Sequence, residues 1–296
     1  MNRQGGAAYP DSLESVPSSR QVIAVVGCKG GVGATVLAAN LAVLTAAESL
    51  RPVLAVDLAG ERGDMMHVLG VNPHHPPVQF GPHQGGPTAL LNGLTTGPGG
   101  VRFMRAAFDE HAPAATLARQ VRSLCHTLRV LFDVVVIDVA RRPDALLPAL
   151  LSGAGEVVVI SSMTRPAAHA TRRLLAGLDA AGDVAARRIV ALNRTEANTD
   201  LDRAAVDAII GVPAVVQVPY DAAVVGSSVN AGEPFVLRDP EAQTSRRLRD
   251  LARSLKILDE RAAPRDDPRG AQAESAAPAA LPLSAWRRRL GNVTRR

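Results

Sequence analysis

The sequence predicts an α/β fold: a mostly parallel, twisted sheet with helices on both faces. Continuous runs of Val and Ile, such as residues 134–137, indicate strands that are buried on both sides. Stretches with helical spacing alternate with these runs, which favours parallel strands joined by helical crossovers. The 296 residues are enough for one large domain of this kind or two ordinary ones, with a full-sized core.

The expected strands are short apolar runs that follow one another along the chain. The first is rich in β-branched residues, and the third is continuously apolar at its centre. The six runs span residues 21–27, 52–57, 132–138, 156–161, 188–192 and 214–218.

Helical spacing recurs in the segments between and after these runs. The first helix is expected over residues 34–49, where Leu37, Leu41 and Leu44 lie on one face. Further helices are expected near residues 115–131, 166–181, 201–210 and 241–260.

Residues 71–100 interrupt this alternation. Prolines and glycines are frequent there, which predicts a long loop or an inserted excursion. Four histidines lie in or beside the segment, but their spacing matches no known ligand pattern and no cysteine joins them. We therefore expect a solvated loop and no metal site at His67, His74, His75 and His83.

Composition at the two ends of the chain differs from that of the middle. Residues 1–20 are rich in Gly, Pro and Ser and predict a disordered leader. The α/β domain is expected over residues 21–260, followed by a flexible linker over 261–280 and a basic tail over 281–296.

The positive charge of the chain is concentrated in this tail. The formal net charge is +5, from 33 basic and 28 acidic residues. The last 16 residues hold five arginines and no acid, so the other 280 residues sum to zero. A basic surface across the whole fold would indicate nucleic-acid binding. Since the fold itself is neutral, DNA is a less expected partner.

The sequence also limits where the protein is expected to act. No apolar run approaches about 18 residues, so we expect no transmembrane helix. The N-terminus lacks the basic-then-apolar pattern of a signal peptide. Two cysteines, Cys28 and Cys125, cannot form a disulfide framework, which agrees with a reducing compartment. A cytoplasmic location is the expectation.

A glycine-rich segment, Gly27 to Thr35, follows the first expected strand and opens the first expected helix. This is the context of a phosphate-binding P-loop, in which backbone N–H groups and the helix N-terminus face phosphate oxygens. The hydroxyl of Thr35 is placed to bind Mg²⁺. A tight turn without a ligand is the alternative. A dinucleotide site is excluded, because the segment contains no G-x-G-x-x-G pattern.

The run Lys29-Gly30-Gly31-Val32-Gly33-x-Thr35 resembles the deviant Walker A motif, K-G-G-x-G-K-[ST], of the ParA/MinD superfamily. The resemblance covers about residues 20–260. It includes residues 52–57, the strand 132–138 as a Walker B strand, Leu192-Asn193-Arg194, and the segments 218–221 and 230–234.

This resemblance implies a P-loop NTPase that holds ATP or ADP with Mg²⁺. It also implies a homodimer with the nucleotide sandwiched between subunits, in which Lys29 reaches the nucleotide of the partner. Asn193 would contact the adenine. The implied nucleotide contacts are Lys29, Gly30, Gly31, Val32, Gly33, Ala34, Thr35, Val36, Asn193 and Pro219, and the implied metal ligands are Thr35, Asp57 and Asp138.

Two departures from the family pattern concern hydrolysis. The second P-loop lysine, which grips the β- and γ-phosphates, is Ala34 here, and the second aspartate after the second strand, which positions the attacking water, is Ala59. Phosphoryl transfer depends on positioning and charge stabilisation, and one lost contact can reduce the rate by about 10²–10³. We therefore expect at most a weak ATPase, with no residue confidently assigned as catalytic.

With an alanine at position 34, the glycine-rich segment is similar to that of the atypical CpaE/TadZ branch of this superfamily. Members of that branch help to assemble Flp/Tad pili at a cell pole. That resemblance implies a hydrolysis-impaired localisation or scaffold protein for pilus or secretion machinery. The sequence also resembles septum-site-determining proteins. Two alternatives therefore stay open: an active ATPase of chromosome or plasmid partition or septum placement, and a nucleotide-free pseudo-ATPase that acts through protein contacts.

The basic tail has the pattern of a short amphipathic helix. Such a helix with Trp can lie in the interface of an anionic membrane, and the resemblance to MinD, which ends in a membrane-targeting helix, agrees. A disordered tail, a nucleic-acid arm and a partner-docking helix are the alternatives. The residues that would carry peripheral attachment, at the inner face of the membrane or a cell pole, are Trp286, Arg287, Arg288, Arg289 and Leu290.

Overall fold

The computed structural model describes residues 20–49, 51–59, 62–72, 76–80, 87–109, 111–139, 146–182, 187–195 and 201–258. The predictions for the leader up to residue 19, the linker 261–280 and the tail lie outside the described residues. The same holds for three of the four histidines, namely His74, His75 and His83.

One twisted sheet organises the molecule, with strand order β3-β5-β2-β6-β1-β7-β8-β9. Every pair along this order is parallel, and the short β4 pairs antiparallel with β5. This confirms the predicted α/β fold class. The strands are β1 Gln21–Gly27, β2 Val53–Asp57, β3 Val78–Phe80, β4 Thr95–Thr96, β5 Arg102–Phe108, β6 Val134–Val139, β7 Glu156–Ser162, β8 Arg187–Thr195 and β9 Val216–Pro219.

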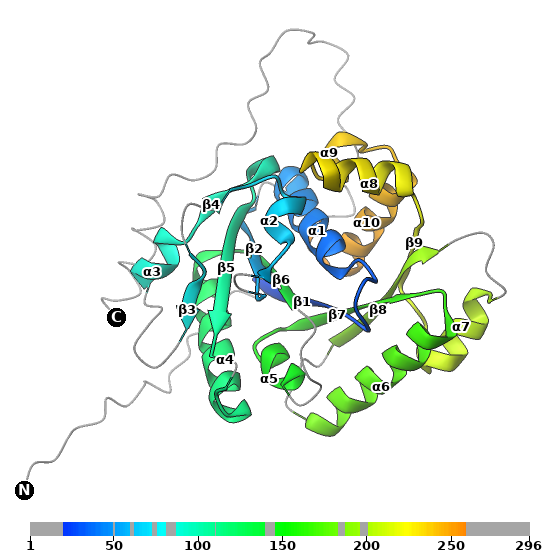
Figure 1. The fold of residues 1–296 in the computed structure, drawn as a ribbon, viewed down its shortest axis with the longest axis horizontal. Coiled ribbons are helices and arrows are strands. Elements are labelled where there is room, and N and C mark those ends of the chain that lie inside the picture. The colour runs from blue at the N-terminus through cyan, green and yellow to red at the C-terminus, as the bar shows by residue number, and fades with distance from the viewer. Residues whose placement is uncertain are drawn as a thin grey trace, which may run out of the picture.

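Helices cover both faces of the sheet (Figure 1). One layer contains α1 (Ala34–Ser49), α2 (Met65–Val68), α8 (Ala222–Ala231), α9 (Phe235–Arg238) and α10 (Gln243–Ser254). The opposite layer contains α4 (Ala114–Leu131), α5 (Leu147–Leu151), α6 (Arg165–Ala181) and α7 (Arg203–Ile210). Within the described ranges no helix is long and apolar enough to cross a bilayer.

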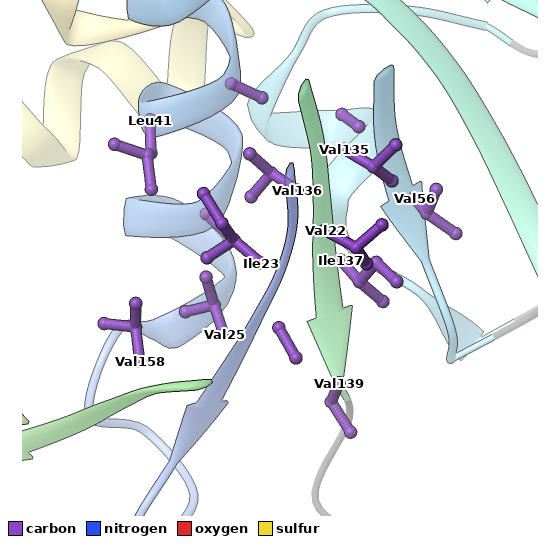
Figure 2. Close-up of a cluster of buried hydrophobic side chains, with 14 of the residues drawn as sticks. Val22, Ile23, Val25, Leu41, Val56, Val135, Val136, Ile137, Val139 and Val158 are labelled. Carbon is purple, nitrogen blue, oxygen red and sulfur yellow. The ribbon is translucent and has the colours of Figure 1, made fainter. Parts of the chain in front are cut away.

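The core is thickest where the central strands β1 and β6 meet α1. Figure 2 shows Ile23, Val25 and Val136 on the side of Leu41 of α1, while Val22 and Val135 point to the other side of the sheet. All six side chains are at most 1% exposed. This two-sided burial explains why the strand sequences are continuously apolar and do not alternate.

The first helix is buried around most of its circumference. Residues 37–46 of α1 are all buried, because the sheet lies on one side of the helix and α9 and α10 lie on another. A helix enclosed in this way carries apolar residues all round. It therefore holds the loop before it in a fixed position relative to the sheet.

The segment 71–100 is more regular than a long loop. It contains β3, the short helix α3 (Pro87–Asn92), β4 and the 3₁₀ turn Pro98–Gly100. Among the described prolines, Pro77 directly precedes β3, Pro87 begins α3 and Pro98 begins the 3₁₀ turn, positions where a missing N–H is tolerated. The strand β5, which follows, was not predicted either, because Arg102 and Arg105 interrupt its apolar pattern.

We expect Leu41→Ala to lower the free energy of unfolding by about 2–5 kcal/mol, the range for a buried Leu that leaves a cavity. Leu41 is 1% exposed at the contact between α1 and the central strands. Urea unfolding followed by circular dichroism measures the change. Leu237→Ala, at a side chain that is 38% exposed, is the matched control and should stay within about 1 kcal/mol. Equal losses in both variants would contradict the assignment of this contact as the core.

Candidate functional site

A glycine-rich loop joins the end of β1 to the start of α1, as the sequence predicts. Gly31 and Gly33 adopt left-handed conformations with φ of 76° and 88°, which favour glycine. The amide of Cys28 donates to the carbonyl of Ile160 at 2.9 Å and so ties the loop to β7. A side chain at Gly27 would place its Cβ 2.8 Å from Val32 Cγ2 and 2.9 Å from the Lys29 carbonyl, so the loop would have to shift to accept it. The loop therefore curls tightly at the carboxyl end of the sheet.

The loop leaves a group of backbone donors unused. The N–H groups of residues 33–36 donate to no described residue, whereas Leu37 N–H already bonds to Gly33 O at 3.0 Å. These are the first amides of a 16-residue helix, where the aligned peptide dipoles place partial positive charge. Open space lies where side chains would stand at Gly30 and Gly31. Such a set of amides is suited to an anion such as phosphate.

A buried hydrogen bond connects the loop to the end of β6. The Thr35 hydroxyl donates to Asp138 Oδ2 at 2.7 Å, and Asp138 is 4% exposed. The pKa of the Asp138 carboxyl is raised to about 7. Burial is the main cause, the Thr35 hydrogen bond opposes it, and the nearby carboxylates of Asp57 and Asp64 add to it. Negative charge is thus unfavourable at Asp138 without a counter-ion.

Asp57 stands beside Asp138, since the two residues are register partners on β2 and β6. Its carboxylate is fully buried and accepts hydrogen bonds from the amides of Ala59, at 2.8 Å, and Met65, at 3.1 Å. A Cβ at Gly63 would lie 2.1 Å from Asp57 Oδ2, so the turn closes directly over the carboxylate. Burial raises the pKa of Asp57 as well. In this structure Asp57 holds the turn that leads to α2.

The donor set fits Mg²⁺. The Thr35 hydroxyl and the Asp138 carboxylate supply hard oxygen ligands next to the unused amides. In the described part of the chain no group of three or more His, Cys, Asp or Glu side chains could hold a metal. Mg²⁺ suits such a site, because it keeps several waters and usually binds through one or two protein oxygens together with substrate phosphates.

Asn193, at the end of β8, fastens the loop from the other side. Its side-chain nitrogen Nδ2 donates to the carbonyl of Val32 at 2.8 Å. A Cβ at Gly33 would lie 2.5 Å from that nitrogen, so glycine is required there by contact as well as by conformation. The side chain of Asn193 therefore reaches the loop, and it also lines the pocket beside it.

This pocket, of about 220 Å³, opens beside the loop on the α1 side. Asn193 and Pro219, both predicted site residues, line it together with Gly33 and Val36. Arg194, which follows Asn193 in the sequence motif and has φ of 54°, also lines the pocket. Thr244 was not predicted, because it lies 51 positions beyond Asn193 and no motif marks it. The remaining lining residues are Leu37, Tyr220, Asp221, Ala222, Val225, Gly226 and Phe235.

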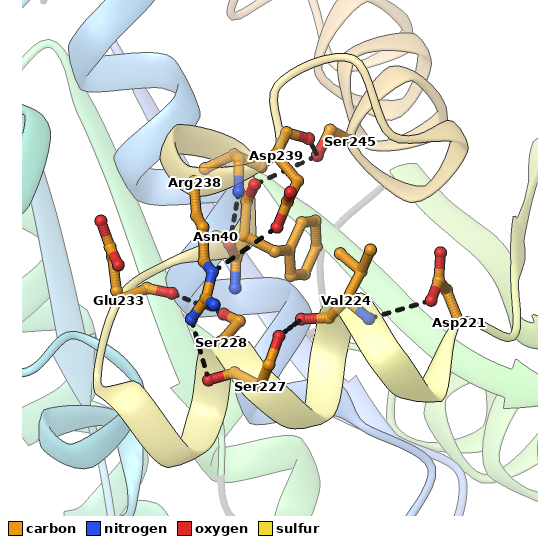
Figure 3. A network of polar contacts seen from close by, with 11 residues as sticks. Asn40, Asp221, Val224, Ser227, Ser228, Glu233, Arg238, Asp239 and Ser245 are labelled. Atoms are coloured by element: carbon orange, nitrogen blue, oxygen red, sulfur yellow. Dashed lines mark hydrogen bonds and ion pairs between the residues drawn. The ribbon is translucent and has the colours of Figure 1, made fainter.

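Figure 3 shows how the outer wall of the pocket is held. Asp221 caps α8 by accepting from the Val224 amide at 2.9 Å. Ser228 donates to the carbonyl of Glu233 at 2.6 Å, closing the turn between α8 and α9. Asn40, inside α1, accepts from the Val236 amide at 3.2 Å. The helix that begins at the loop thus also fixes the position of α9.

The remaining predicted site residues lie as follows. Lys29 is exposed, and among the described residues nothing pairs with its side chain. Ala34 is the first residue of α1, and Ala59 follows β2. Neither position supplies a charged group to the site. Asp64, beside α2, is an exposed carboxylate near the pair Asp57 and Asp138 and makes no side-chain cap bond to the helix.

The raised pKa of Asp138 predicts a pH-dependent stability in buffer without Mg²⁺. The folded chain holds the Asp138 proton more strongly than the unfolded chain, whose reference pKa is 3.8. The free energy of unfolding should therefore fall as the pH rises from about 4 to 7, by roughly 4 kcal/mol at most from this group. Urea unfolding over this range measures the slope.

Asp138→Asn should lose part of this fall, because its amide does not titrate. Asp133→Asn, at the residue directly before the first residue of β6, is the matched control. It should keep the slope of the unchanged protein. If Asp138→Asn retained the full slope, the raised pKa of the Asp138 carboxyl would be refuted as the cause of the pH dependence.

Comparisons with known proteins show the family of the chain. The family described as the CobQ/CobB/MinD/ParA nucleotide binding domain matches residues 23–235. An uncharacterized ATP-binding protein of Methanocaldococcus jannaschii is 25% identical over 242 residues, covering 79% of this chain and 86% of that protein.

Two solved structures share the fold. A ParA family ATPase from Chlorobium tepidum superposes with a TM-score of 0.65 at 20% identity, covering 79% of this chain and 98% of that one. The septum site-determining protein MinD of Pyrococcus horikoshii, complexed with Mg-ADP, gives 0.64 at 21% identity, covering 83% and 99%. Since the family matches most of its length, the chain belongs to the CobQ/CobB/MinD/ParA nucleotide-binding domain family.

Proposed function

We propose that the protein binds ATP or ADP with Mg²⁺ at the loop between β1 and α1. The observation that carries this proposal is the set of unused amides of residues 33–36 beside the Thr35–Asp138 hydrogen bond. Phosphates would meet the amides, and Mg²⁺ would be held by Thr35 and Asp138, with Asp57 beside them. The pocket at Asn193 and Pro219 would take the base. The relatives described as ATP-binding or as holding Mg-ADP support this assignment.

Hydrolysis is proposed to be slow. Ala34 and Ala59 stand where the deviant Walker A pattern and the second-strand pattern carry a lysine and an aspartate, and neither alanine can stabilise charge or position water. Asp64 is the described carboxylate that could partly replace the second of these, but it lies on the exposed side of the turn. The bound nucleotide would therefore define the state of the protein more than supply energy through hydrolysis.

A nucleotide-sandwich homodimer is the proposed active form. Lys29 is one of two lysines in a chain with 31 arginines, and it is exposed on the loop without a described partner. A cation in this position is available to a phosphate of the facing subunit. In this proposal the lysine makes dimer formation depend on the nucleotide.

The cellular role that we propose is that of a localisation or scaffold protein for pilus or secretion machinery, in the manner of the CpaE/TadZ branch. The α/β domain over residues 21–260 would mark a membrane site and recruit partners to it. Septum placement or partition by an active ATPase, and a nucleotide-free scaffold, are the competing roles. An active ATPase would differ from the proposed role by turning ATP over, and a nucleotide-free scaffold would differ by not binding nucleotide. Both differences can be measured.

Calorimetric titration with ATP and Mg²⁺ should give measurable binding. Lys29→Ala should weaken ATP binding about tenfold or more, since a hydrogen bond to a charged group contributes about 1.5–3 kcal/mol, and should abolish ATP-dependent dimerisation in analytical ultracentrifugation. Lys256→Ala is the matched control, because Lys256 follows α10 near Leu255, whose carbonyl contacts Gln21 at the far end of β1. An absence of heat with the unchanged protein would contradict nucleotide binding.

Restoring the two missing groups should restore turnover. The double variant Ala34→Lys with Ala59→Asp should raise the rate of phosphate release by at least about 10²–10³ over the unchanged protein, the factor that one such contact contributes in other enzymes. A coupled phosphate-release assay measures it. Rapid turnover by the unchanged protein would instead favour the active-ATPase role.

The basic tail is proposed to attach the dimer to anionic membranes. Each Arg near such a surface contributes about 1 kcal/mol, and two tails in one dimer would bind together with higher avidity. Sedimentation with vesicles containing anionic phosphatidylglycerol should pellet the full chain with ATP more than a version ending at residue 280. Equal pelleting of the two would contradict this attachment.

A further inference from the structure

A second pocket lies on the opposite helical layer, between α5 and α6, with a volume of about 170 Å³. Leu147 and Pro148 of α5 form one wall, and Ala170, Leu174 and Gly177 of α6 form the other, with Arg173 at the side. In Figure 1 both helices lie across the sheet from α1. The pocket is thus separate from the proposed nucleotide site.

Gly177 stands in the interior of the 17-residue helix α6, where the fold does not need a glycine. Its backbone is not left-handed, and a Cβ placed there would meet nothing within 4 Å. Glycine inside a helix costs about 0.5–1 kcal/mol relative to Ala. An open, uncovered helix surface at this position gives a ligand close access to the backbone.

Arg173 is the charged residue that lines this pocket, and the helices on this side of the sheet carry more basic than acidic side chains. The helices α4, α5 and α6 carry six arginines between them, and their described acid, Asp179, is paired with Arg188 of β8. Arg172 and Arg173 are both exposed and have no partner among the described residues. A ligand that places apolar side chains in the pocket therefore meets positive charge at its rim.

We propose that the groove between α5 and α6 is a docking site for an acidic amphipathic helix of a partner protein. An apolar side chain of that helix fills the pocket against Leu147, Leu174 and Gly177, and a carboxylate pairs with Arg173. A buried apolar anchor with a charged rim is the usual anatomy of such interfaces. A nucleic acid would use the arginines but leave the apolar hollow empty. Docking here goes beyond the proposed nucleotide function and needs no nucleotide.

The test selects helical peptides from a displayed library on the full chain without nucleotide. Acidic sequences with apolar residues at spacings of three and four should be enriched, and fluorescence anisotropy then measures the affinity of the enriched peptides. Arg173→Glu should weaken binding about tenfold or more, because it replaces an attractive charge contact at the rim with a repulsive one. Gly177→Trp, which fills the groove, should weaken binding by a similar factor.

Two matched controls separate the groove from general charge and bulk. Arg172→Glu makes the same charge change at a neighbouring exposed residue that does not line the pocket, and Ala176→Trp adds the same ring outside it. Both should weaken binding by less than about threefold, a difference below 1 kcal/mol. Circular dichroism and thermal unfolding show whether each variant is folded.

Three outcomes would overturn the proposal. The first is enrichment of sequences without acids. The second is equal weakening by Arg172→Glu and Arg173→Glu in folded variants. The third is binding of a 20-base-pair duplex that depends on Arg173 while the selected peptides do not compete for it, which would assign the surface to nucleic acid.

Discussion

The hydrogen bond from Thr35 to Asp138 joins the first helix to the central strand β6, and the site is built around it. The two residues are 103 positions apart in sequence and 2.7 Å apart in space. The parallel pairing of β1 and β6 brings the carboxyl ends of both strands to one edge of the sheet and so places the two residues together. Burial makes the charge of Asp138 unfavourable, and Asp57 in the neighbouring register position adds to this effect. The ionised Asp138 carboxylate is thus electrostatically unfavourable, and a cation bound beside it would relieve this cost.

The helix α1 transmits this arrangement to the rest of the molecule. Its first turn carries the unused amides, and its interior Asn40 holds α9 through the amide of Val236. Asn193, from the far side, binds the loop at Val32. The phosphate loop and the wall of the neighbouring pocket are therefore parts of one rigid assembly. A ligand bound at the loop would therefore contact the same assembly that positions α9.

Much of this arrangement could be predicted from sequence, for local reasons. The run 21–27, the glycines after it and the helical spacing from residue 34 are contiguous, so the loop and its flanking elements were predictable. The bond between Asn193 and Val32 spans 161 positions and leaves no local signal. The strand β5 was missed because Arg102 and Arg105 break its apolar run, and the strand is recognised only by its pairing with β2. Asp57 was expected as a metal ligand, but its hydrogen bonds to the amides of Ala59 and Met65 could not be foreseen.

The crystal structure of the protein with Mg²⁺ and a non-hydrolysable ATP analogue is the most direct measurement. The predicted result places the phosphates on the amides of residues 33–36, Mg²⁺ between Thr35 and the phosphates, and the base in the pocket lined by Asn193 and Pro219. Density for the nucleotide at another place, or an unchanged Thr35–Asp138 hydrogen bond with an empty loop at millimolar nucleotide, would contradict the assignment of this loop as the nucleotide site.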